Sequence, residues 1–372
     1  MTIPLVDLKA QHAEVAADVQ EAFAGVLGAT NFILGKPVAE FETAFASFSK
    51  VAHCIGVANG TDALEIALRA LDIGQGHEVI LPANTFVATA LAVVRAGATP
   101  VLVDCDPQHH LIDPGRVEAA ITPRTRALMP VHLYGQCAPM RDLMDIAERR
   151  GLMIIEDAAQ AQGAEHNGSP VGSFGAISGT SFYPGKNLGA YGDAGALLTN
   201  SASLANRARA LRNYGSEVKY FHPEIGFNSR LDTLQAVVLS AKLKRLGAWN
   251  EQRRTAANRY SDLLREHQAD VFAAPSEAPG NIHVWHLYVV RVPRRDSVLE
   301  RMNADGVGAG VHYPVPIHLQ GAFHSLGHGV GAFPVTEKAA AEILSLPIYP
   351  QITEEQQGRV VEVLLRAVAT GG

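Results

Sequence analysis

The sequence predicts an α/β fold with a large, mostly parallel sheet that helices cover on both faces. Short apolar runs alternate with helical patterns from about residue 53 to residue 200. Strands that alternate with helices usually pair in parallel, because each helix carries the chain back across the sheet. The composition changes at residues 273–280, AAPSEAPG, where a smaller unit is expected to begin.

Seven apolar runs are expected to form the strands of this sheet, at residues 53–57, 77–81, 99–104, 127–133, 152–157, 179–182 and 195–199. Ligands of such sheets bind beyond the carboxyl ends of the strands. Polar or aromatic residues follow three of these runs, and they are Asn59-Gly60-Thr61, Asn84-Thr85-Phe86, and Asp157 with Gln160. The pattern therefore predicts that these residues meet in one cleft.

A long helical stretch is expected at residues 231–244, before a small α+β unit that begins at residues 282–292. We expect a large α/β domain over residues 1–250, with an N-terminal helical arm, and a small C-terminal α+β domain over residues 251–372. The boundary is placed within residues 245–280.

Composition excludes several functional classes. The chain has 31 Lys and Arg against 37 Asp and Glu, with a net charge of −6, which argues against a nucleic-acid surface. No apolar run approaches the ~20 residues of a membrane span, and charged residues interrupt the N-terminus where a signal peptide would need an apolar core. Three cysteines without paired spacing indicate buried free thiols. We expect a soluble, cytoplasmic protein that binds neither nucleic acid nor membrane.

Lys186 and Asp157 are the most informative pair of residues. Lys186 lies in the turn SFYPGKNLG at residues 181–189, and Asp157 ends the apolar run of IIEDAAQ at residues 154–160. A lysine amine forms a Schiff base with the aldehyde of pyridoxal phosphate, and a carboxylate keeps the pyridine nitrogen protonated. Taken singly, a turn lysine is usually solvated and a carboxylate at a strand end is often a cap or a metal ligand. The combination with Gln160 favours a pyridoxal phosphate enzyme.

A phosphate site is suggested by Gly60 and Thr61, which begin a helix after a strand, because a helix N-terminus binds anions. The alternative is an ordinary helix cap by Asn59 or Thr61. Phe86 is suited to stacking on an aromatic cofactor, although an aromatic residue there is about as often plain core.

Two other kinds of site are disfavoured. The histidine pairs at residues 109–110 and at His324 and His328 have no carboxylate or cysteine at ligand spacing, so we expect no metal site. The glycine-rich stretches at residues 74–79 and 327–331 lack the final glycine and the strand-to-helix setting of a dinucleotide fingerprint. A nicotinamide oxidoreductase is therefore not expected.

Over nearly its full length the chain resembles the DegT/DnrJ/EryC1 (StrS) family of nucleotide-sugar aminotransferases. The matching motifs are VDLK at 6–9, GTDAL at 60–64, EDAAQ at 156–160, FYPGKNLG at 182–189, GDAGA at 192–196, NSRLD at 228–232 and HYPVP at 312–316. The resemblance implies the PLP-dependent transferase fold of type I, similar to aspartate aminotransferase, with a seven-stranded sheet. It also implies a homodimer whose two active sites lie at the subunit interface and share residues of both subunits.

The resemblance assigns roles to individual residues. Lys186 looks like the Schiff-base lysine, Asp157 the partner of the pyridine nitrogen and Gln160 the partner of the ring oxygen. The other expected cofactor contacts are the stacking ring and the phosphate ligands, namely Phe86, Gly60, Thr61, Ser181 and, from the partner subunit, Asn228. The cofactor is then pyridoxal 5'-phosphate, with pyridoxamine phosphate as the intermediate form in a ping-pong transfer from L-glutamate to a keto-sugar. In relatives that became sugar dehydratases a histidine replaces the lysine, so Lys186 favours transamination.

Three local patterns resemble the aminotransferases that act at C-3 of dTDP-3-keto-6-deoxyhexoses. They are residues 182–189, residues 211–220 and residues 312–319. On this resemblance four residues are expected to contact the sugar or its diphosphate: Tyr183, Lys219, His312 and Tyr313. For Lys219, a solvated loop charge is a nearly equal alternative.

Other readings of the same chain stay open. The segments LYGQC at 133–137 and NSRLDTLQ at 228–235 are shared with UDP-2-acetamido-3-keto-glucuronate aminotransferases, and a C-4 keto-sugar aminotransferase is a further alternative. A PLP-binding regulatory protein would need a DNA-binding module, for which the acidic chain has no spare segment. A cysteine desulfurase would need a cysteine on a mobile loop, whereas all three cysteines lie in or beside expected strands.

Overall fold

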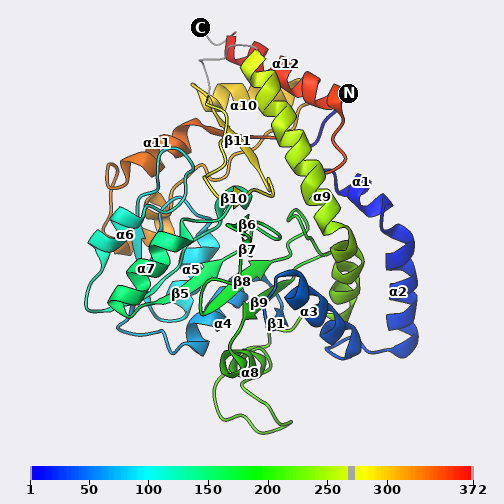
Figure 1. The fold of residues 1–372 in the computed structure, drawn as a ribbon, viewed down its shortest axis with the longest axis vertical. Helices are drawn as coiled ribbons and strands as arrows, with labels where there is room; N and C mark the ends of the chain where they lie inside the picture. The colour runs from blue at the N-terminus through cyan, green and yellow to red at the C-terminus, as the bar shows by residue number, and fades with distance from the viewer. Residues whose placement is uncertain (1, 267–272, 370–372) are drawn as a thin grey trace.

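The computed structural model describes residues 2–266 and 273–369 (Figure 1). The helices are α1 Leu8–Ala13, α2 Ala16–Ala29, α3 Lys36–Phe48, α4 Gly60–Ala70, α5 Val87–Arg95, α6 Pro114–Ala120, α7 Met140–Arg150, α8 Ala202–Leu211, α9 Thr233–Glu266, α10 Arg295–Ala304, α11 Pro334–Glu342 and α12 Glu354–Ala369. The strands are β1 His53–Val57, β2 Glu78–Pro82, β3 Thr99–Val103, β4 Thr125–Leu128, β5 Met153–Asp157, β6 Glu165–His166, β7 Ser169–Pro170, β8 Ile177–Ser181, β9 Gly195–Thr199, β10 Asn281–Ile282, β11 Tyr288–Arg291 and β12 Ile343–Leu346. Short 3-10 turns are η1 Leu133–Gly135, η2 Ile317–Leu319 and η3 Gly321–Leu326.

The large sheet has seven strands in the order β1-β9-β8-β5-β4-β2-β3. The strand pairs β8–β5, β5–β4, β4–β2 and β2–β3 are parallel, whereas β9 runs antiparallel to both β1 and β8. The predicted α/β fold with a mostly parallel seven-stranded sheet is confirmed. Because β9 alone reverses within this sheet, the carboxyl ends of β1, β2, β5 and β8 lie at one edge.

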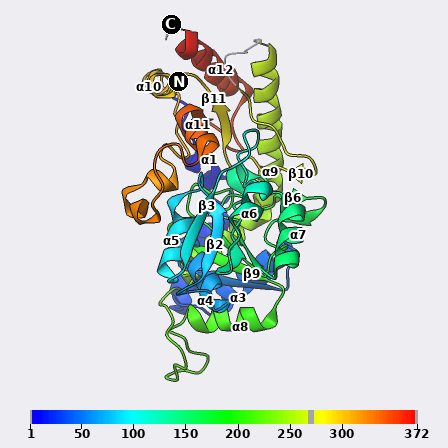
Figure 2. The ribbon, with the colours of Figure 1, turned by 90° about the vertical axis from the view of Figure 1, so that its left-hand side faces the viewer.

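Helices cover both faces of the sheet. Apolar residues of α4, α5 and α8 form one buried cluster with the strands, and α6 and α7 form another. Figure 2 shows α5 on one side of β2 and β3, with α6 and α7 on the other. β2 and β9 are buried along their whole length. Because strands that are buried on both faces need apolar side chains on both, their sequences are nearly continuous apolar runs.

One expected element differs in the structure. Of the run expected at residues 127–133, β4 includes only the part up to Leu128. Pro130 has no N–H and interrupts the ladder, Val131 still forms a bridge with Asp157, and the chain then turns through η1, where Tyr134 has a φ of +61°. Between β8 and β9 the chain forms a loop that carries Lys186, which agrees with the turn expected at residues 181–189.

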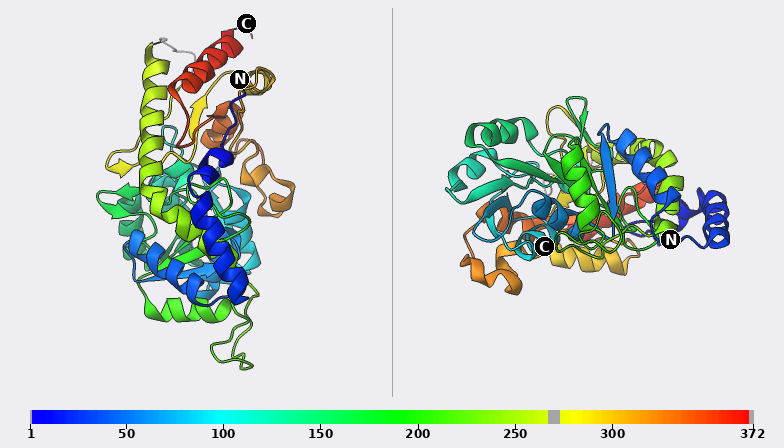
Figure 3. Two further views of the ribbon diagram at one scale, coloured as in Figure 1. Left: turned by 90° about the vertical axis from the view of Figure 1, so that its right-hand side faces the viewer. Right: turned by 90° about the horizontal axis from the view of Figure 1, so that it is seen from below.

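The helix expected at residues 231–244 is α9, which continues to Glu266 and passes the expected boundary at residues 250 and 251. Its first half packs against α2 and α3, while Ala257, Tyr260 and Leu264 belong to the core that α12 and β11 build. Figure 3 shows the N-terminal helix α2 lying beside α9. We therefore propose that the two domains divide within α9.

The N-terminal segment joins the small domain. Ile3 forms a bridge with Val307, and its side chain is buried in the core of that domain. Within the described residues, no helix is long and apolar enough to cross a membrane.

Candidate active site

A cavity of about 430 Å³ lies at the carboxyl edge of the large sheet. Ten of the twelve residues predicted for the site line it, and they are Gly60, Thr61, Phe86, Asp157, Gln160, Ser181, Tyr183, Lys186, His312 and Tyr313. Leu5 and Val6 from the N-terminal segment complete the wall. Asn84, which was expected in the same cleft, instead donates from its side chain to the carbonyl of His110.

Lys186 projects from the loop between β8 and β9, and a turn bond from its N–H to the Tyr183 carbonyl (2.8 Å) shapes this loop. The neighbouring Asn187 is buried and donates through Nδ2 to the Val284 carbonyl (2.9 Å) and to Asn250 Oδ1 (3.0 Å). Burial lowers the pKa of Lys186 from 10.5 to about 8, although Asp157 opposes the shift. A substantial fraction of the amine is therefore neutral and nucleophilic near physiological pH.

Asp157 ends β5, and its carboxylate is buried in the cavity wall. Thr89 Oγ1 donates to its Oδ2 (2.8 Å), and the Ala159 N–H donates to its Oδ1 (3.1 Å). Since the Thr89 hydroxyl hydrogen is used in this way, Thr85 Oγ1, at 2.8 Å from Thr89 Oγ1, is the donor in the bond between the two threonines. Burial raises the pKa of Asp157, and these hydrogen bonds and the Lys186 charge oppose that shift. A cation placed beside this carboxylate would be strongly favoured.

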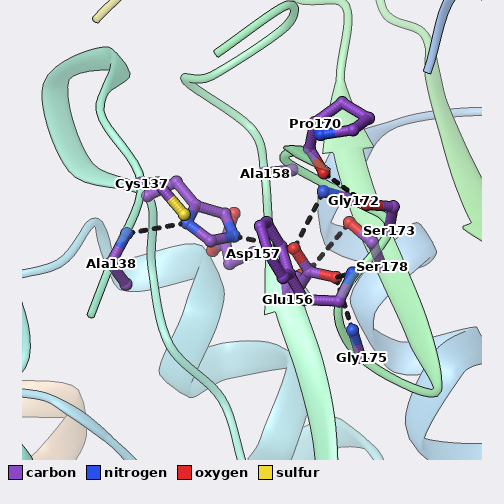
Figure 4. A network of polar contacts seen from close by, with 12 residues as sticks. Cys137, Ala138, Glu156, Asp157, Ala158, Pro170, Gly172, Ser173, Gly175 and Ser178 are labelled. Atoms are coloured by element: carbon purple, nitrogen blue, oxygen red, sulfur yellow. Dashed lines mark hydrogen bonds and ion pairs between the residues drawn. The ribbon is translucent and has the colours of Figure 1, made fainter. Parts of the chain in front are cut away.

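Glu156, the residue before Asp157, points to the other side of β5 and anchors the strand end (Figure 4). Its fully buried carboxylate accepts from the N–H groups of Gly172 (2.8 Å), Phe174 (2.9 Å) and Gly175 (2.8 Å) and contacts His132 Nε2 at 3.0 Å. His132 Nδ1 accepts from the Ala138 N–H, so Nε2 carries the proton and donates. This fully bonded network holds β5 and therefore fixes Asp157.

Gln160 uses both ends of its amide. Its Oε1 accepts from the Tyr134 N–H (2.7 Å), and its Nε2 donates to the Tyr313 hydroxyl (2.9 Å). The Tyr134 hydroxyl in turn donates to the carbonyl of His312 (2.7 Å). The amide thus links the strand side of the cavity to the segment that carries His312 and Tyr313.

The phosphate site expected from the sequence is the first turn of α4, whose Gly60 and Thr61 line the cavity. Asn59 caps this helix by accepting from the Asp62 N–H (2.8 Å), which leaves the N–H groups of Gly60 and Thr61 without helical acceptors. A Cβ on Gly60 would lie 2.6 Å from the Ser181 Cβ, so only glycine allows this close approach. The cap expected as the alternative exists, and the expected anion site lies on the same turn.

The aromatic wall is formed by Phe86 and Tyr313, whose ring centroids are 5.0 Å apart. Phe86 is 49% exposed, and its ring is therefore not part of a packed core. His312 Nδ1 contacts Ser345 Oγ at 2.8 Å, and burial together with Lys186 lowers the pKa of His312 to about 4. His312 is therefore a neutral group at this wall.

Lys219 and Asn228 do not reach the cavity of their own chain. They lie on the long loop that follows α8 and extends from the bottom of the molecule in Figure 1. Lys219 Nζ lies 5.0 Å from the ring centroid of Tyr220, and both residues are exposed. The predicted roles of Lys219 and Asn228 stay predictions that require a second subunit.

Sequence reasoning did not single out Thr89 and His286, which line the cavity, or Tyr134, which bonds to Gln160. Thr89 follows Thr85 at helical spacing, and this was the available signal, because residues four apart share one helix face. The Tyr134 N–H donates to Gln160, and His286 contacts the side-chain amide of Asn187. These partners are distant in sequence, so no local pattern indicates Tyr134 or His286.

A second cavity, of about 220 Å³, has Leu287 in its lining, as the first cavity does. Its described lining contains histidines and Arg291 but neither a lysine nor a carboxylate, so this second cavity has no pair like that of Lys186 and Asp157. The three cysteines are free and buried, as expected, and none lines the active cavity.

The residues fit pyridoxal phosphate. An amine, a buried carboxylate and the helix terminus expected to bind an anion face one cavity, and at Gly60 this terminus packs so closely against Ser181 that a Cβ would clash. The aldehyde, the ring nitrogen and the phosphate of the cofactor require groups of these three kinds.

Comparisons with known proteins agree with this geometry. The family described as the DegT/DnrJ/EryC1/StrS aminotransferase family matches residues 13–365. A Geobacillus stearothermophilus protein named pleiotropic regulatory protein is 48% identical, with 97% of each chain covered. A Streptomyces venezuelae protein named dTDP-3-amino-3,4,6-trideoxy-alpha-D-glucose transaminase is 45% identical, with 97% of this chain and 95% of that one covered. An Acidithiobacillus ferrooxidans protein named UDP-N-acetyl-3-dehydro-alpha-D-glucosamine 3-aminotransferase is also 45% identical, with 98% of each chain covered.

Solved structures give the same picture. The crystal structure of DesV from S. venezuelae matches with a TM-score of 0.95 at 45% identity, over 98% of each chain. The structure of NtdA from Bacillus subtilis, which holds the cofactor PMP, matches with a TM-score of 0.89 at 35% identity, over 96% of this chain and 82% of that one.

Proposed function

The chain belongs to the DegT/DnrJ/EryC1/StrS aminotransferase family, and on this premise we propose that it transfers the amino group of L-glutamate to C-3 of a dTDP-linked 3-keto-6-deoxyhexose. The protein is a pyridoxal phosphate-dependent sugar aminotransferase. The product of the proposed reaction is a dTDP-3-amino-3,6-dideoxyhexose. The observation that carries the proposal is the placement of Lys186 and Asp157 in one cavity with the anion site of α4.

Pyridoxal phosphate, when bound, supplies an electron sink that lets an amino group pass between an amino acid and a keto-sugar. The Lys186 amine would hold the cofactor and move a proton at Nζ to and from the reacting carbon. Its pKa of about 8 suits both tasks, because a fully charged ammonium can neither attack nor accept a proton. Asp157 would keep a proton on the ring nitrogen, with its orientation fixed by Thr89 and Ala159.

The segment around His312 and Tyr313 supports a sugar subsite. Both side chains line the cavity, and the family resemblance of this segment is to C-3 aminotransferases of dTDP-sugars. Tyr183 is 59% exposed at the cavity, as suits a residue that meets a substrate arriving from solvent. We propose that these three residues contact the sugar and that Lys219 of a second subunit contacts the diphosphate.

A UDP-linked 3-keto-sugar is the second candidate substrate. The specific observation is that the A. ferrooxidans relative, whose name specifies such a sugar, is as similar to this chain as the S. venezuelae relative. Both candidates place the new amine at C-3.

A two-substrate assay tests the proposal. The purified protein loaded with pyridoxal phosphate is expected to release 2-oxoglutarate from L-glutamate continuously only when dTDP-3-keto-6-deoxyhexose is present. Without the sugar, release should stop after about one equivalent per active site, because the amino group then has no acceptor. Release that ignores the dTDP-sugar would reject the proposed substrate.

A further inference from the structure

His286 lines the active cavity but belongs to none of the roles described so far. It lies between β10 and β11, and its side chain is half-buried. Its Nδ1 is 3.2 Å from Oδ1 of Asn187, the residue that follows Lys186. The imidazole therefore contacts the loop that presents the reactive amine.

Two backbone carbonyls determine which nitrogen of His286 carries its proton. The carbonyl of Gln162 accepts from Asn250 Nδ2 (2.9 Å), and the carbonyl of Val284 accepts from Asn187 Nδ2 (2.9 Å). A carbonyl only accepts, so both amide orientations are fixed. Asn187 thus turns its Oδ1 to His286, and since that oxygen also only accepts, His286 Nδ1 must donate.

The other ring nitrogen, Nε2, is therefore the acceptor in the neutral imidazole. Nδ1 is engaged by Asn187, and His286 and Lys186 line the same cavity, although no hydrogen bond joins the two side chains in the described structure. Burial lowers the pKa of His286 well below its usual range, and the charges of Lys186, Arg253, His312 and His283 lower it further. His286 therefore stays neutral and keeps the lone pair of Nε2 over the working pH range.

We propose that His286 is a positioning residue whose Nε2 accepts a hydrogen bond from the Lys186 amine and so holds the amine's own lone pair towards the centre of the cavity. A lysine on a loop has four rotatable bonds, and an acceptor of fixed position reduces this freedom. The inference rests on the proposed use of Lys186 as the reactive amine. It adds a residue outside the motifs that indicate the site.

Two substitutions separate this role from a purely structural one. His286→Asn keeps an amide nitrogen near the place of Nδ1, so it can retain the bond to Asn187, but it has no group at the place of Nε2. His286→Gln places an amide near Nε2 and loses the bond to Asn187. If His286 only supports the fold, His286→Gln should disturb the protein more than His286→Asn does. If the proposed role is correct, the pKa of Lys186 should change more in His286→Asn than in His286→Gln.

The readout is the apparent pKa of the Lys186 amine in the full-length protein freed of cofactor. It is measured by acetic anhydride labelling across pH, with peptide mass spectrometry of Lys186 and with exposed Lys36 as the internal reference. We expect the pKa of Lys186 to fall by about one unit in His286→Asn, because the ammonium loses an acceptor, and to change little in His286→Gln. An unchanged value in His286→Asn, or a fall only in His286→Gln, would overturn the proposal.

A second measurement needs no change at His286. ¹⁵N NMR of histidine-labelled protein is compared between the wild type and Lys186→Ala, and we expect one acceptor-type imidazole nitrogen to move downfield when the lysine is removed. If no imidazole nitrogen moves, the hydrogen bond does not exist. Neither measurement uses sugar or donor, so a wrong sugar assignment leaves both outcomes unchanged, whereas retained turnover in Lys186→Ala would reject the proposed function itself.

Discussion

At the residue scale, the site depends on two buried groups whose surroundings suit them to opposite tasks. Burial lowers the pKa of Lys186 to about 8 and raises the pKa of Asp157. The Lys186 amine is thereby made more nucleophilic, and the Asp157 carboxylate favours a cationic partner. In both cases the partner is not part of the chain. Such opposed environments are typical of catalytic pairs.

The first prediction concerns Lys186→Ala. We expect the variant to lose covalent attachment of the cofactor after borohydride reduction, read by intact mass, and to lose turnover by about a thousandfold. Lys244→Ala, which removes an exposed lysine of α9, is the control and should retain both. Normal turnover in Lys186→Ala would mean that another amine reacts.

The second prediction concerns Thr89, whose hydroxyl donates to Asp157. Thr89→Val keeps the shape and removes a hydrogen bond to a charged group, so kcat/KM should fall roughly tenfold. Thr199→Val is matched, because Thr199 is equally buried but donates to the Ala176 carbonyl away from the cavity. Equal losses in the two variants would show a general effect on stability instead of an effect on Asp157.

At the element scale, α9 connects the N-terminal arm to the loop that carries Lys186. Lys242 of α9 is 2% exposed, and its Nζ donates to Gln11 Oε1 in α1 (2.9 Å) and to the Gly189 carbonyl (2.7 Å). This single amine therefore ties together three segments that are distant in sequence.

The third prediction follows from the pKa of Lys242, which burial lowers from 10.5 to about 8. Between these two values the unfolded chain binds more protons than the folded one, so this group adds stability as pH rises and the contribution is lost as pH falls towards 8. Lys242→Met lacks this pH-dependent contribution to stability. The contribution of Lys186, whose pKa is also lowered, is present in both wild type and variant and therefore cancels when the two are compared. The difference in unfolding free energy between wild type and variant is measured by urea titration. It should therefore change by about 3 kcal/mol in favour of the wild type between these pH limits. A pH-independent difference would contradict the low pKa.

The sequence predicts elements best where burial dominates the pattern. The run at residues 152–157 became β5 almost residue for residue, because it is buried and continuously apolar up to its two carboxylates. The run at residues 127–133 was predicted too long, because apolar character hid the effect of Pro130 on the ladder. Lys186, Asp157 and the turn of α4 were found from local motifs, whereas His286 depends on amides that only the fold brings together. Lys219 and Asn228 do not line the cavity of their own chain, so their predicted roles depend on a second subunit.

At the scale of the whole molecule, the loop after α8 exposes several large apolar side chains. Tyr220, Phe221 and Ile225 are 81%, 71% and 94% exposed, on a loop that extends away from the sheet (Figure 1). Solvation of so many large apolar groups is unfavourable, and a partner surface would remove it. We propose that a second copy of this chain covers the loop, which agrees with the shared sites that the family resemblance implies.

The fourth prediction is therefore that the protein sediments as a homodimer and that Ile225→Glu shifts it towards monomer. Burying a carboxylate without a partner in an interface would cost several kcal/mol, which is enough to dissociate a moderate dimer. Val330→Glu, on an equally exposed apolar residue of another loop, is the control and should stay dimeric. A wild-type monomer at micromolar concentration would contradict the proposed partner.

The central claim is tested most directly by mass-spectrometric analysis of the product from the loaded enzyme and L-glutamate. A dTDP-3-keto-6-deoxyhexose, a dTDP-4-keto-6-deoxyhexose and a UDP-linked 3-keto-sugar are offered in parallel. The account predicts an amino sugar from the dTDP-3-keto-sugar, with the new nitrogen at C-3. An amine formed only from the C-4 ketone or only from the UDP-sugar would contradict the assigned substrate, and no amine from any of the three would contradict the account as a whole.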